Sequence, residues 1–210
     1  MKSESFSVLT TSERTLFKKL STPHKIQDFL DALPINFEKN GDTHYSPREV
    51  LKRNTAHCIE GALLAAAALW YHGEKPFLMD MRTKERDAEH VIALYRKNGY
   101  WGALSKTNHA VLRYRDPIYK TVRELALSYF HEYFRDHDGL KTLVSYSRPV
   151  NLSSLGTSWI TDTEHLWHID DILNNARHFP LVPKGHARLV RNATPFERQV
   201  LNHTEWHEKH

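Results

Sequence analysis

Apolar and polar positions follow a helical period through the first third of the chain. Residues 10–15 open a polar helix, and residues 22–34 predict a second helix with a proline near its start and another at its end. A third, short helix is expected after Ser46, where Pro47 occupies the first turn and a glutamate follows as in a capping box. These helices lead into the most apolar stretch of the sequence.

That stretch runs from Ile59 to Trp70 and is strongly helix-forming and apolar on nearly every side. Such a pattern is typical of a central helix that other elements surround. Gly73 stands where a left-handed residue would end the helix. Cys58, the only cysteine of the chain, therefore lies in the first turn of this helix.

Beyond this helix the pattern changes to short apolar runs that are typical of strands. Residues 76–81 and 90–96 predict two strands, the second apolar on both faces as in the interior of a sheet. Asn98 and Gly99 predict a two-residue hairpin turn. Residues 100–105 are then expected to return antiparallel to the preceding strand.

The remainder of the chain gives weaker signals. Residues 115–117 are expected to break the chain before a helix over residues 118–133. One more strand is predicted within residues 140–150, followed by helices over residues 163–175 and from Pro195 onward.

The order of these elements predicts an α+β fold in which the Cys-bearing central helix packs on an antiparallel sheet with flanking helices. We expect a single domain over residues 1–210. Its core would span about residues 22–150, and residues 151–210 would form a helical C-terminal extension.

Composition and charge narrow the range of functions. The 29 basic residues are interleaved with 25 acidic ones, without the concentrated basic stripe that nucleic-acid binding needs. The longest apolar run, residues 61–70, is too short to span a bilayer, so we expect no membrane segment and a cytoplasmic protein. A single cysteine excludes an intrachain disulfide and suits a reducing compartment.

No cofactor and no metal are expected. The 15 histidines are scattered, and zinc spacings of the Cys/His type are impossible with one cysteine. His203, His207 and His210 would share one face of the predicted last helix and offer an alternative metal site. A frayed, solvated terminus is the favoured interpretation of this group.

The position of Cys58 suggests chemistry. Unpaired backbone N–H groups and the positive end of the helix dipole favour a thiolate over a thiol, although a small buried hydrophobic residue is the alternative. A nucleophilic cysteine needs a base within hydrogen-bond reach. The two-residue hairpin turn places His90 opposite Thr107, with Ser105 diagonal to His90 on the same face of the sheet.

Two segments together resemble a known family. They are Cys58-Ile-Glu-Gly-Ala-Leu-Leu-Ala-Ala and Glu89-His-Val-Ile-Ala-Leu-Tyr-Arg-Lys-Asn-Gly-Tyr-Trp-Gly-Ala-Leu-Ser105, with a short strand between them. This order resembles the transglutaminase-like superfamily, relatives of papain-like thiol peptidases, over roughly residues 22–107. The family pattern is a cysteine on a helix, a histidine that opens a hairpin, and a tryptophan followed by an aspartate on the return strand. Cys58, His90 and Trp101 match it.

The resemblance implies a papain/transglutaminase-like core and a catalytic set in which Ser105 stands at the family's aspartate position. A serine can accept a hydrogen bond from imidazole but carries no charge to stabilise imidazolium. Asp116 or Asp87 could substitute from elsewhere, or the site could be weak or inactive.

The resemblance also implies an oxyanion hole and a substrate cleft. The family pairs the backbone N–H of the cysteine with an upstream side-chain donor, for which Gln27 and Asn54 are the candidates. Glu60 and Trp101 are candidates for the substrate cleft. A carboxylate such as that of Glu60 in the first turn of a helix also complements the helix dipole.

The function that these residues predict is thiol-dependent amide chemistry on a peptide, protein or small amide substrate. Cys58 would attack the carbonyl, and His90 would take and return the proton. Hydrolysis by a cysteine peptidase or amidase is preferred over acyl transfer, because it is the commoner outcome in prokaryotic members of such families. The alternative is a catalytically inactive transglutaminase-like binding module, in which Ser105 in place of the aspartate accounts for the loss of activity.

Overall fold

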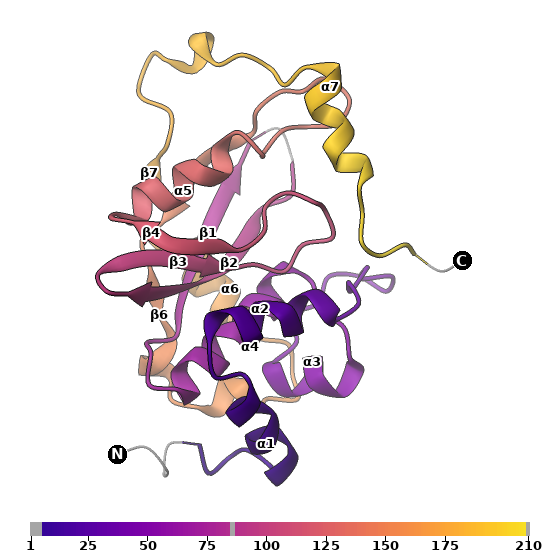
Figure 1. The fold of residues 1–210 in the computed structure, drawn as a ribbon, viewed down its shortest axis with the longest axis vertical. Coiled ribbons are helices and arrows are strands. Elements are labelled where there is room, and N and C mark those ends of the chain that lie inside the picture. The colour runs from indigo at the N-terminus through magenta and orange to yellow at the C-terminus, as the bar shows by residue number, and fades with distance from the viewer. Residues whose placement is uncertain (1–5, 85–86, 209–210) are drawn as a thin grey trace.

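The computed structural model describes residues 6–84 and 87–208 of the protein. Within these residues it has an α+β structure with an antiparallel sheet (Figure 1). The α-helices are α1 (Thr11–Lys19), α2 (Pro23–Ala32), α3 (Pro47–Arg53), α4 (Cys58–Tyr71), α5 (Val122–Phe130), α6 (Trp167–Asn174) and α7 (Pro195–Arg198). The strands are β1 (Phe77–Thr83), β2 (His90–Lys97), β3 (Tyr100–Leu104), β4 (Arg115–Tyr119), β5 (Leu143–Ser147), β6 (Val150–Asn151) and β7 (His178–Pro180).

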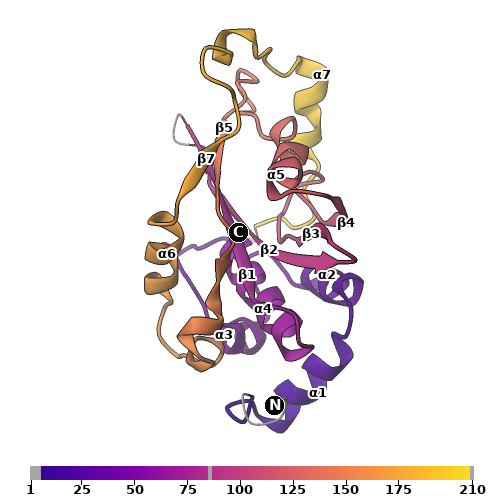
Figure 2. The same cartoon turned by 90° about the vertical axis from the view of Figure 1, so that its left-hand side faces the viewer.

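The sheet runs in the order β4-β3-β2-β1-β5-β7, with β6 also paired to β1. Every pair is antiparallel. Helix α4 packs against β2 and belongs to one hydrophobic cluster together with α6, whereas α5 belongs to a second cluster. Figure 2 shows α5 and α6 on opposite sides of the sheet. The expected arrangement of a Cys-bearing helix on an antiparallel sheet is confirmed at this level.

Strand β2 separates the two clusters. Val91, Ala93 and Tyr95 face the cluster of α4, and the intervening Ile92 and Leu94 face the cluster of α5. Side chains of a strand alternate between its faces, so a strand covered by helices on both sides is apolar at every position. The prediction that this strand is buried on both faces is confirmed.

The hairpin between β2 and β3 has the predicted register. Asn98 and Gly99 both have positive φ, 50° and 89°, as a two-residue turn of this type needs. Pairing runs from Lys97 opposite Tyr100 to Ala93 opposite Leu104. Strand β3 ends there, so the chain leaves the sheet before it could pair with His90, the first residue of β2.

Gly99→Val should destabilise the protein by about 1 to 2 kcal/mol, because a β-branched residue is strained at positive φ. A Cβ at Gly99 would meet no atom within 4 Å, so the loss would come from the backbone alone. The thermal midpoint of Gly99→Val should therefore fall, and that of the control Asn98→Gly should not. Equal midpoints for Gly99→Val and the unchanged protein would contradict this turn.

The helix boundaries follow the predicted signals. Thr22 and Ser46 are the N-caps of α2 and α3, and each accepts a hydrogen bond from a backbone N–H of the first turn. Gly73, two residues after the end of α4, has a φ of 93°. Local chemistry therefore sets these ends, as the sequence predicts.

The expectation for residues 115–121 is wrong. Instead of a chain break followed by a helix, Arg115–Tyr119 forms β4, which pairs with β3 through Trp101 and Tyr119. Strand β4 lies at the edge of the sheet, where Pro117 removes no ladder hydrogen bond that the sheet needs. Helix α5 begins only after the N-cap Thr121.

The C-terminal region also differs from the expected helical extension. Strand β7 adds an edge to the sheet, and α7 is followed by a short 3₁₀ turn that ends at Asn202. Beyond it, the backbone N–H of Glu205 donates to Asn108 and that of Ala110 donates to His203. Because these bonds satisfy the backbone in an extended form, no helix continues here. His203 and His207 therefore do not share a helix face, and His210 lies outside the described residues.

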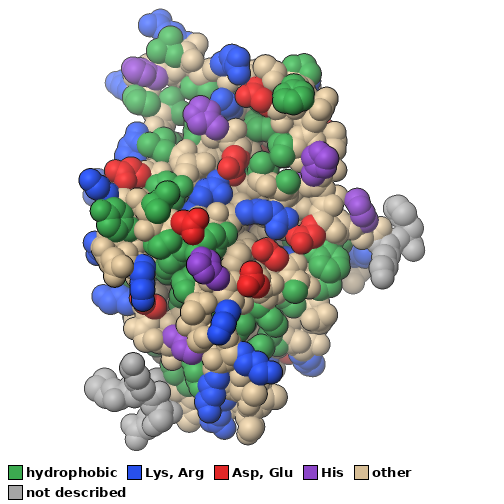
Figure 3. All heavy atoms as spheres, in the orientation of Figure 1, with side chains coloured by type: hydrophobic (Ala, Val, Ile, Leu, Met, Phe, Trp, Pro, Cys, Tyr) green, Lys and Arg blue, Asp and Glu red, His purple; other side chains and the backbone are tan. Residues whose placement is uncertain are grey.

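Two further properties concern the surface charges and the length of the helices. Figure 3 shows Lys and Arg side chains interspersed with Asp and Glu side chains over one face of the molecule. None of the helices in residues 6–84 and 87–208 has both the length and the apolar character needed to cross a membrane.

Candidate active site

Cys58 is the first residue of α4, and its side chain is half-buried at the wall of a cavity of about 690 Å³. His57 is the N-cap of the helix in an extended conformation. The backbone N–H groups of a first helical turn have no partner within the helix, and the helix dipole places positive potential there. The sequence prediction for the position of Cys58 is therefore confirmed.

The start of α4 lies close to the segment that follows β3. A Cβ at Gly61 would collide with the Cβ of Lys106. Glycine at this position therefore lets the helix and the segment of Ser105 approach each other. Lys106 is itself buried and donates a hydrogen bond from Nζ to the carbonyl of Leu33, at the end of α2. Burial lowers the pKa of Lys106 to about 8.

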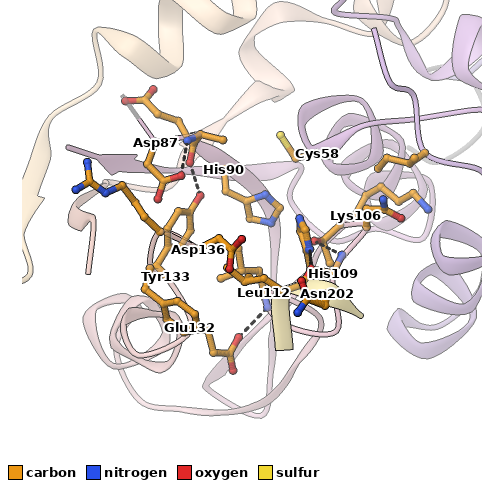
Figure 4. A pocket seen from close by; sticks show the side chains of 18 of the residues that line it. Cys58, Asp87, His90, Lys106, His109, Leu112, Glu132, Tyr133, Asp136 and Asn202 are labelled. Atoms are coloured by element: carbon orange, nitrogen blue, oxygen red, sulfur yellow. Dashed lines mark hydrogen bonds between the residues drawn. The ribbon is translucent and has the colours of Figure 1, made fainter. Parts of the chain in front are cut away.

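His90 lies in the same cavity as Cys58 (Figure 4). Its Nε2 is 2.7 Å from Oγ of Ser105, and that hydroxyl donates to the carbonyl of Leu112 at 2.5 Å. A serine hydroxyl has one proton, and Leu112 receives it, so Nε2–H of His90 must be the donor to Ser105. This arrangement fixes the tautomer of neutral His90 and leaves its Nδ1 as the basic nitrogen.

The backbone conformation and the N–H hydrogen bond of Leu112 hold its carbonyl in place. Leu112 has a φ of 61°, which is uncommon for a bulky residue. Its backbone N–H donates to Oε2 of Glu132 at 2.8 Å, and Glu132 is paired with Arg115 at 2.6 Å. The hydrogen bonds therefore extend from His90 through Ser105 and Leu112 to a carboxylate that does not touch the imidazole.

The thiol of Cys58 is perturbed by two imidazoles. Burial by itself would raise the pKa of Cys58, but hydrogen bonds from His57 and His90, and their positive charge, bring that pKa well below its ordinary value. Nδ1 of His57 is 3.8 Å from Sγ. A thiolate is the nucleophilic form of cysteine, so the site favours the reactive state.

His57 is a site residue that the sequence analysis missed. Its Nε2 lies 2.7 Å from the carbonyl oxygen of Thr43, 3.3 Å from Oε1 of Glu38 and 3.5 Å from Oε1 of Glu60. Although burial opposes protonation, the hydrogen bond and charge of Cys58 and the nearby carboxylate of Glu60 raise the pKa of His57 to about 10. Its place next to Cys58 at the N-cap was the available signal.

Glu60, a substrate-cleft candidate, is completely buried and does not line the cavity. Its carboxylate accepts hydrogen bonds from Asn36, from Thr43 and from the backbone N–H groups of Tyr45 and His57. The structure therefore places it beneath His57, as a partner of the helix start.

Trp101, the other substrate-cleft candidate, is also away from the cavity. Its ring lies in β3 against Phe77 and beneath the guanidinium of Arg96. It belongs to the apolar packing between the sheet and α5.

The two oxyanion candidates also lie elsewhere. Gln27 is buried in α2, where its Nε2 donates to the carbonyl of Ser105 and its Oε1 accepts from the backbone N–H of Ser105. Its amide is therefore committed to holding the Ser105 segment. Asn54 is exposed at the end of α3 with a φ of 53°, and it does not line the cavity.

Neither alternative aspartate contacts His90. Asp87 lines the cavity and accepts a hydrogen bond from the hydroxyl of Thr142 at 2.5 Å. Asp116 lies in β4, 3.9 Å from His24. Within the described part of the chain, Ser105 is the hydrogen-bond partner of the His90 ring.

The C-terminal segment forms one wall of the cavity through Leu201 and Asn202. It is fastened by reciprocal hydrogen bonds between the side chain of Asn108 and the backbone of Trp206, and by an ion pair of Arg113 with Glu205 at 2.8 Å. This wall therefore comes from a part of the chain far from the hairpin in sequence. Asn108 and Trp206, which fasten it, are 98 positions apart.

Comparison with known proteins adds no family assignment. No protein-family model matches the chain, and no curated protein matches it.

Proposed function

We propose that this protein is a thiol enzyme that acts on amide bonds, with Cys58 as the nucleophile and His90 as the proton-transfer group. The observation that carries the proposal is the open cavity in which a helix-start cysteine with a lowered pKa meets an imidazole of fixed tautomer. The order of Cys58, His90 and the hairpin supports a papain/transglutaminase-like core. The substrate would be a peptide, a protein or a small amide.

In the proposed reaction the thiolate of Cys58 attacks the amide carbonyl, and the electron pair of the C=O bond moves to oxygen. The backbone N–H groups at the start of α4 hold that oxyanion. The C–N bond then breaks as protonated His90 gives its proton to the leaving amine. This step leaves a thioester on Cys58 and a neutral imidazole.

Water completes the cycle. Neutral His90 takes a proton from water while the resulting hydroxide attacks the thioester carbonyl. The C–S bond breaks, and the electron pair returns to sulfur. The products are the acid, the thiolate of Cys58 and protonated His90, so atoms and charges balance. We favour hydrolysis, and an amine in place of water would give acyl transfer by the same steps.

The second candidate function is a binding module that has the fold but no chemistry. Ser105 favours it, because the hydroxyl carries no charge to stabilise an imidazolium. Under this alternative Cys58 would be an ordinary thiol and the cavity would hold a ligand without reacting with it.

Alkylation of Cys58 by iodoacetamide as a function of pH separates these two candidates. We expect the reaction to be half-maximal well below the midpoint of an ordinary cysteine, because the neighbouring imidazoles lower the pKa of Cys58. Cys58→Ala is the control for reaction at other groups. An ordinary cysteine titration, half-maximal at about pH 8.5, would contradict the enzyme and favour the binding module.

A further inference from the structure

The two imidazoles beside Cys58 have different partners. His90 donates to Ser105, a neutral hydroxyl, and no carboxylate touches its ring within the described residues. His57 directs Nε2 at the carbonyl of Thr43 and lies within 3.5 Å of the carboxylates of Glu38 and Glu60. Opposite charge at this distance favours the protonated form of an imidazole, and a neutral acceptor does so much less.

Glu60 is arranged to remain an anion. Four donors converge on its two oxygens: Nδ2 of Asn36 at 3.1 Å, Oγ1 of Thr43 at 2.8 Å, and the backbone N–H groups of Tyr45 and His57 at 3.1 and 3.0 Å. An ionised carboxylate is acceptor-only and suits four donors, whereas a protonated one would bring a further donor into a group of donors. The negative charge under His57 is therefore built into the helix start.

His57 has both nitrogens committed as donors when it is protonated. Nε2–H donates to the carbonyl of Thr43, which can only accept. Nδ1 lies 3.8 Å from Sγ of Cys58 and directs its N–H at the sulfur. The ring is mostly buried, so the attraction between its charge and a thiolate is weakly screened by solvent.

We propose that His57 holds Cys58 as a thiolate, and that His90 is thereby left to move protons in the reaction. The proposal rests on the thiol chemistry proposed above. His57, which has carboxylate partners, supplies the stabilising charge. His90, whose partner is a neutral hydroxyl, transfers the proton. Ser105 at the position of the family's aspartate is then compatible with an active site, because the missing charge is supplied at His57.

The charged and titratable groups around His57 come from three elements. The loop between α2 and α3 contributes Glu38 and His44, whose ring centroid lies 6.0 Å from that of His57. Helix α4 contributes Cys58 and Glu60, and β2 contributes His90 on the other side of the sulfur. The carboxylates and the thiolate are the anions of this group, and they favour a protonated His57.

The experiment compares the half-maximal pH of iodoacetamide alkylation of Cys58 in the unchanged protein and in the full-length His57→Gln and His90→Gln variants. We expect the half-maximal pH of His57→Gln to lie about 1 to 3 units above that of the unchanged protein, because loss of an opposite charge in contact shifts a pKa by about that much. The half-maximal pH of His90→Gln should rise by less than that of His57→Gln, because the hydrogen-bond partner of His90 in the described residues is a neutral hydroxyl. Alkylation needs a thiolate but no proton transfer, so it isolates the role assigned to His57.

Several outcomes would overturn the proposal. They are a larger rise of the half-maximal pH in His90→Gln than in His57→Gln, or equal rises in both, since either result would place the charge on His90 or on a shared pair. These results differ from failure of the proposed function, in which the unchanged protein would already titrate as an ordinary thiol.

Two milder variants keep the test decisive if His57→Gln does not fold. Glu38→Gln keeps the acceptor for the backbone N–H of Thr43 but removes a charge beside His57. Ser105→Ala removes the partner of His90 and leaves the surroundings of His57 intact. We expect a higher half-maximal pH of alkylation in Glu38→Gln and an unchanged one in Ser105→Ala. The reverse order would overturn the proposal.

Discussion

Glu60→Ala should destabilise the protein by about 3 to 5 kcal/mol, the cost of removing one partner from a buried charged network. Four donors would lose their acceptor, and Glu38 would be the one carboxylate left of the two beside His57. Denaturant midpoints of the variant and the unchanged protein measure the loss.

Glu124→Ala is the matched control for this variant. Glu124 is also the third residue of its helix and caps the helix start in the same way, but it is exposed on α5. Its loss should cost only about 1 kcal/mol, as for helix caps in general. Equal midpoints for Glu60→Ala and Glu124→Ala would contradict the role of Glu60 as the buried anion of the helix start.

Ser105→Asp should destabilise the protein by several kcal/mol rather than restore a catalytic triad. Ser105 is completely buried, and its hydroxyl donates to the carbonyl of Leu112 at 2.5 Å. A carboxylate there could not donate and would face that carbonyl oxygen at close range. Ser105→Ala should cost less, about 1 to 3 kcal/mol, because it leaves the His90 donor and the Leu112 acceptor unpaired.

The measurement is the thermal midpoint of both Ser105 variants beside their alkylation rate at pH 6. A Ser105→Asp protein that is as stable as the unchanged one and alkylates faster would contradict this account. It would show that the site accepts a carboxylate and that His90 can carry the charge.

The sequence was informative where local chemistry determines the structure. Asn98 and Gly99 permit one turn type, and that turn sets the register that brings His90 and Ser105 onto one side of the sheet. The apolar run after Cys58 likewise predicts a helix packed on all sides, and the helix start follows directly. The α+β class, the place of Cys58 at a helix start and the contact of His90 with Ser105 could therefore be predicted.

Long-range hydrogen bonds could not be predicted in this way. Nothing in the spacing of Gln27 shows that its amide would bind the backbone of Ser105, because that contact depends on how α2 packs. For a similar reason His57 was missed and Glu60 was assigned to the substrate cleft: their partners Asn36 and Thr43 come from a loop without periodicity. The C-terminal wall of the cavity depends on backbone hydrogen bonds of residues 203–205 with Asn108 and Ala110. The sequence of this region predicts a helix and gives no sign of this pairing.

The most direct test of the central claim is the acylation of Cys58 by an activated ester, followed by intact mass and peptide mapping. With p-nitrophenyl acetate the protein should release a burst of p-nitrophenolate and gain the mass of one acetyl group on Cys58. Cys58→Ala should show neither. His90→Gln should form the thioester but hydrolyse it about 10² to 10⁴-fold more slowly, the usual contribution of a general base. An adduct on Cys58 that forms no faster than on a free small thiol, or that is hydrolysed equally fast without His90, would contradict the proposed chemistry.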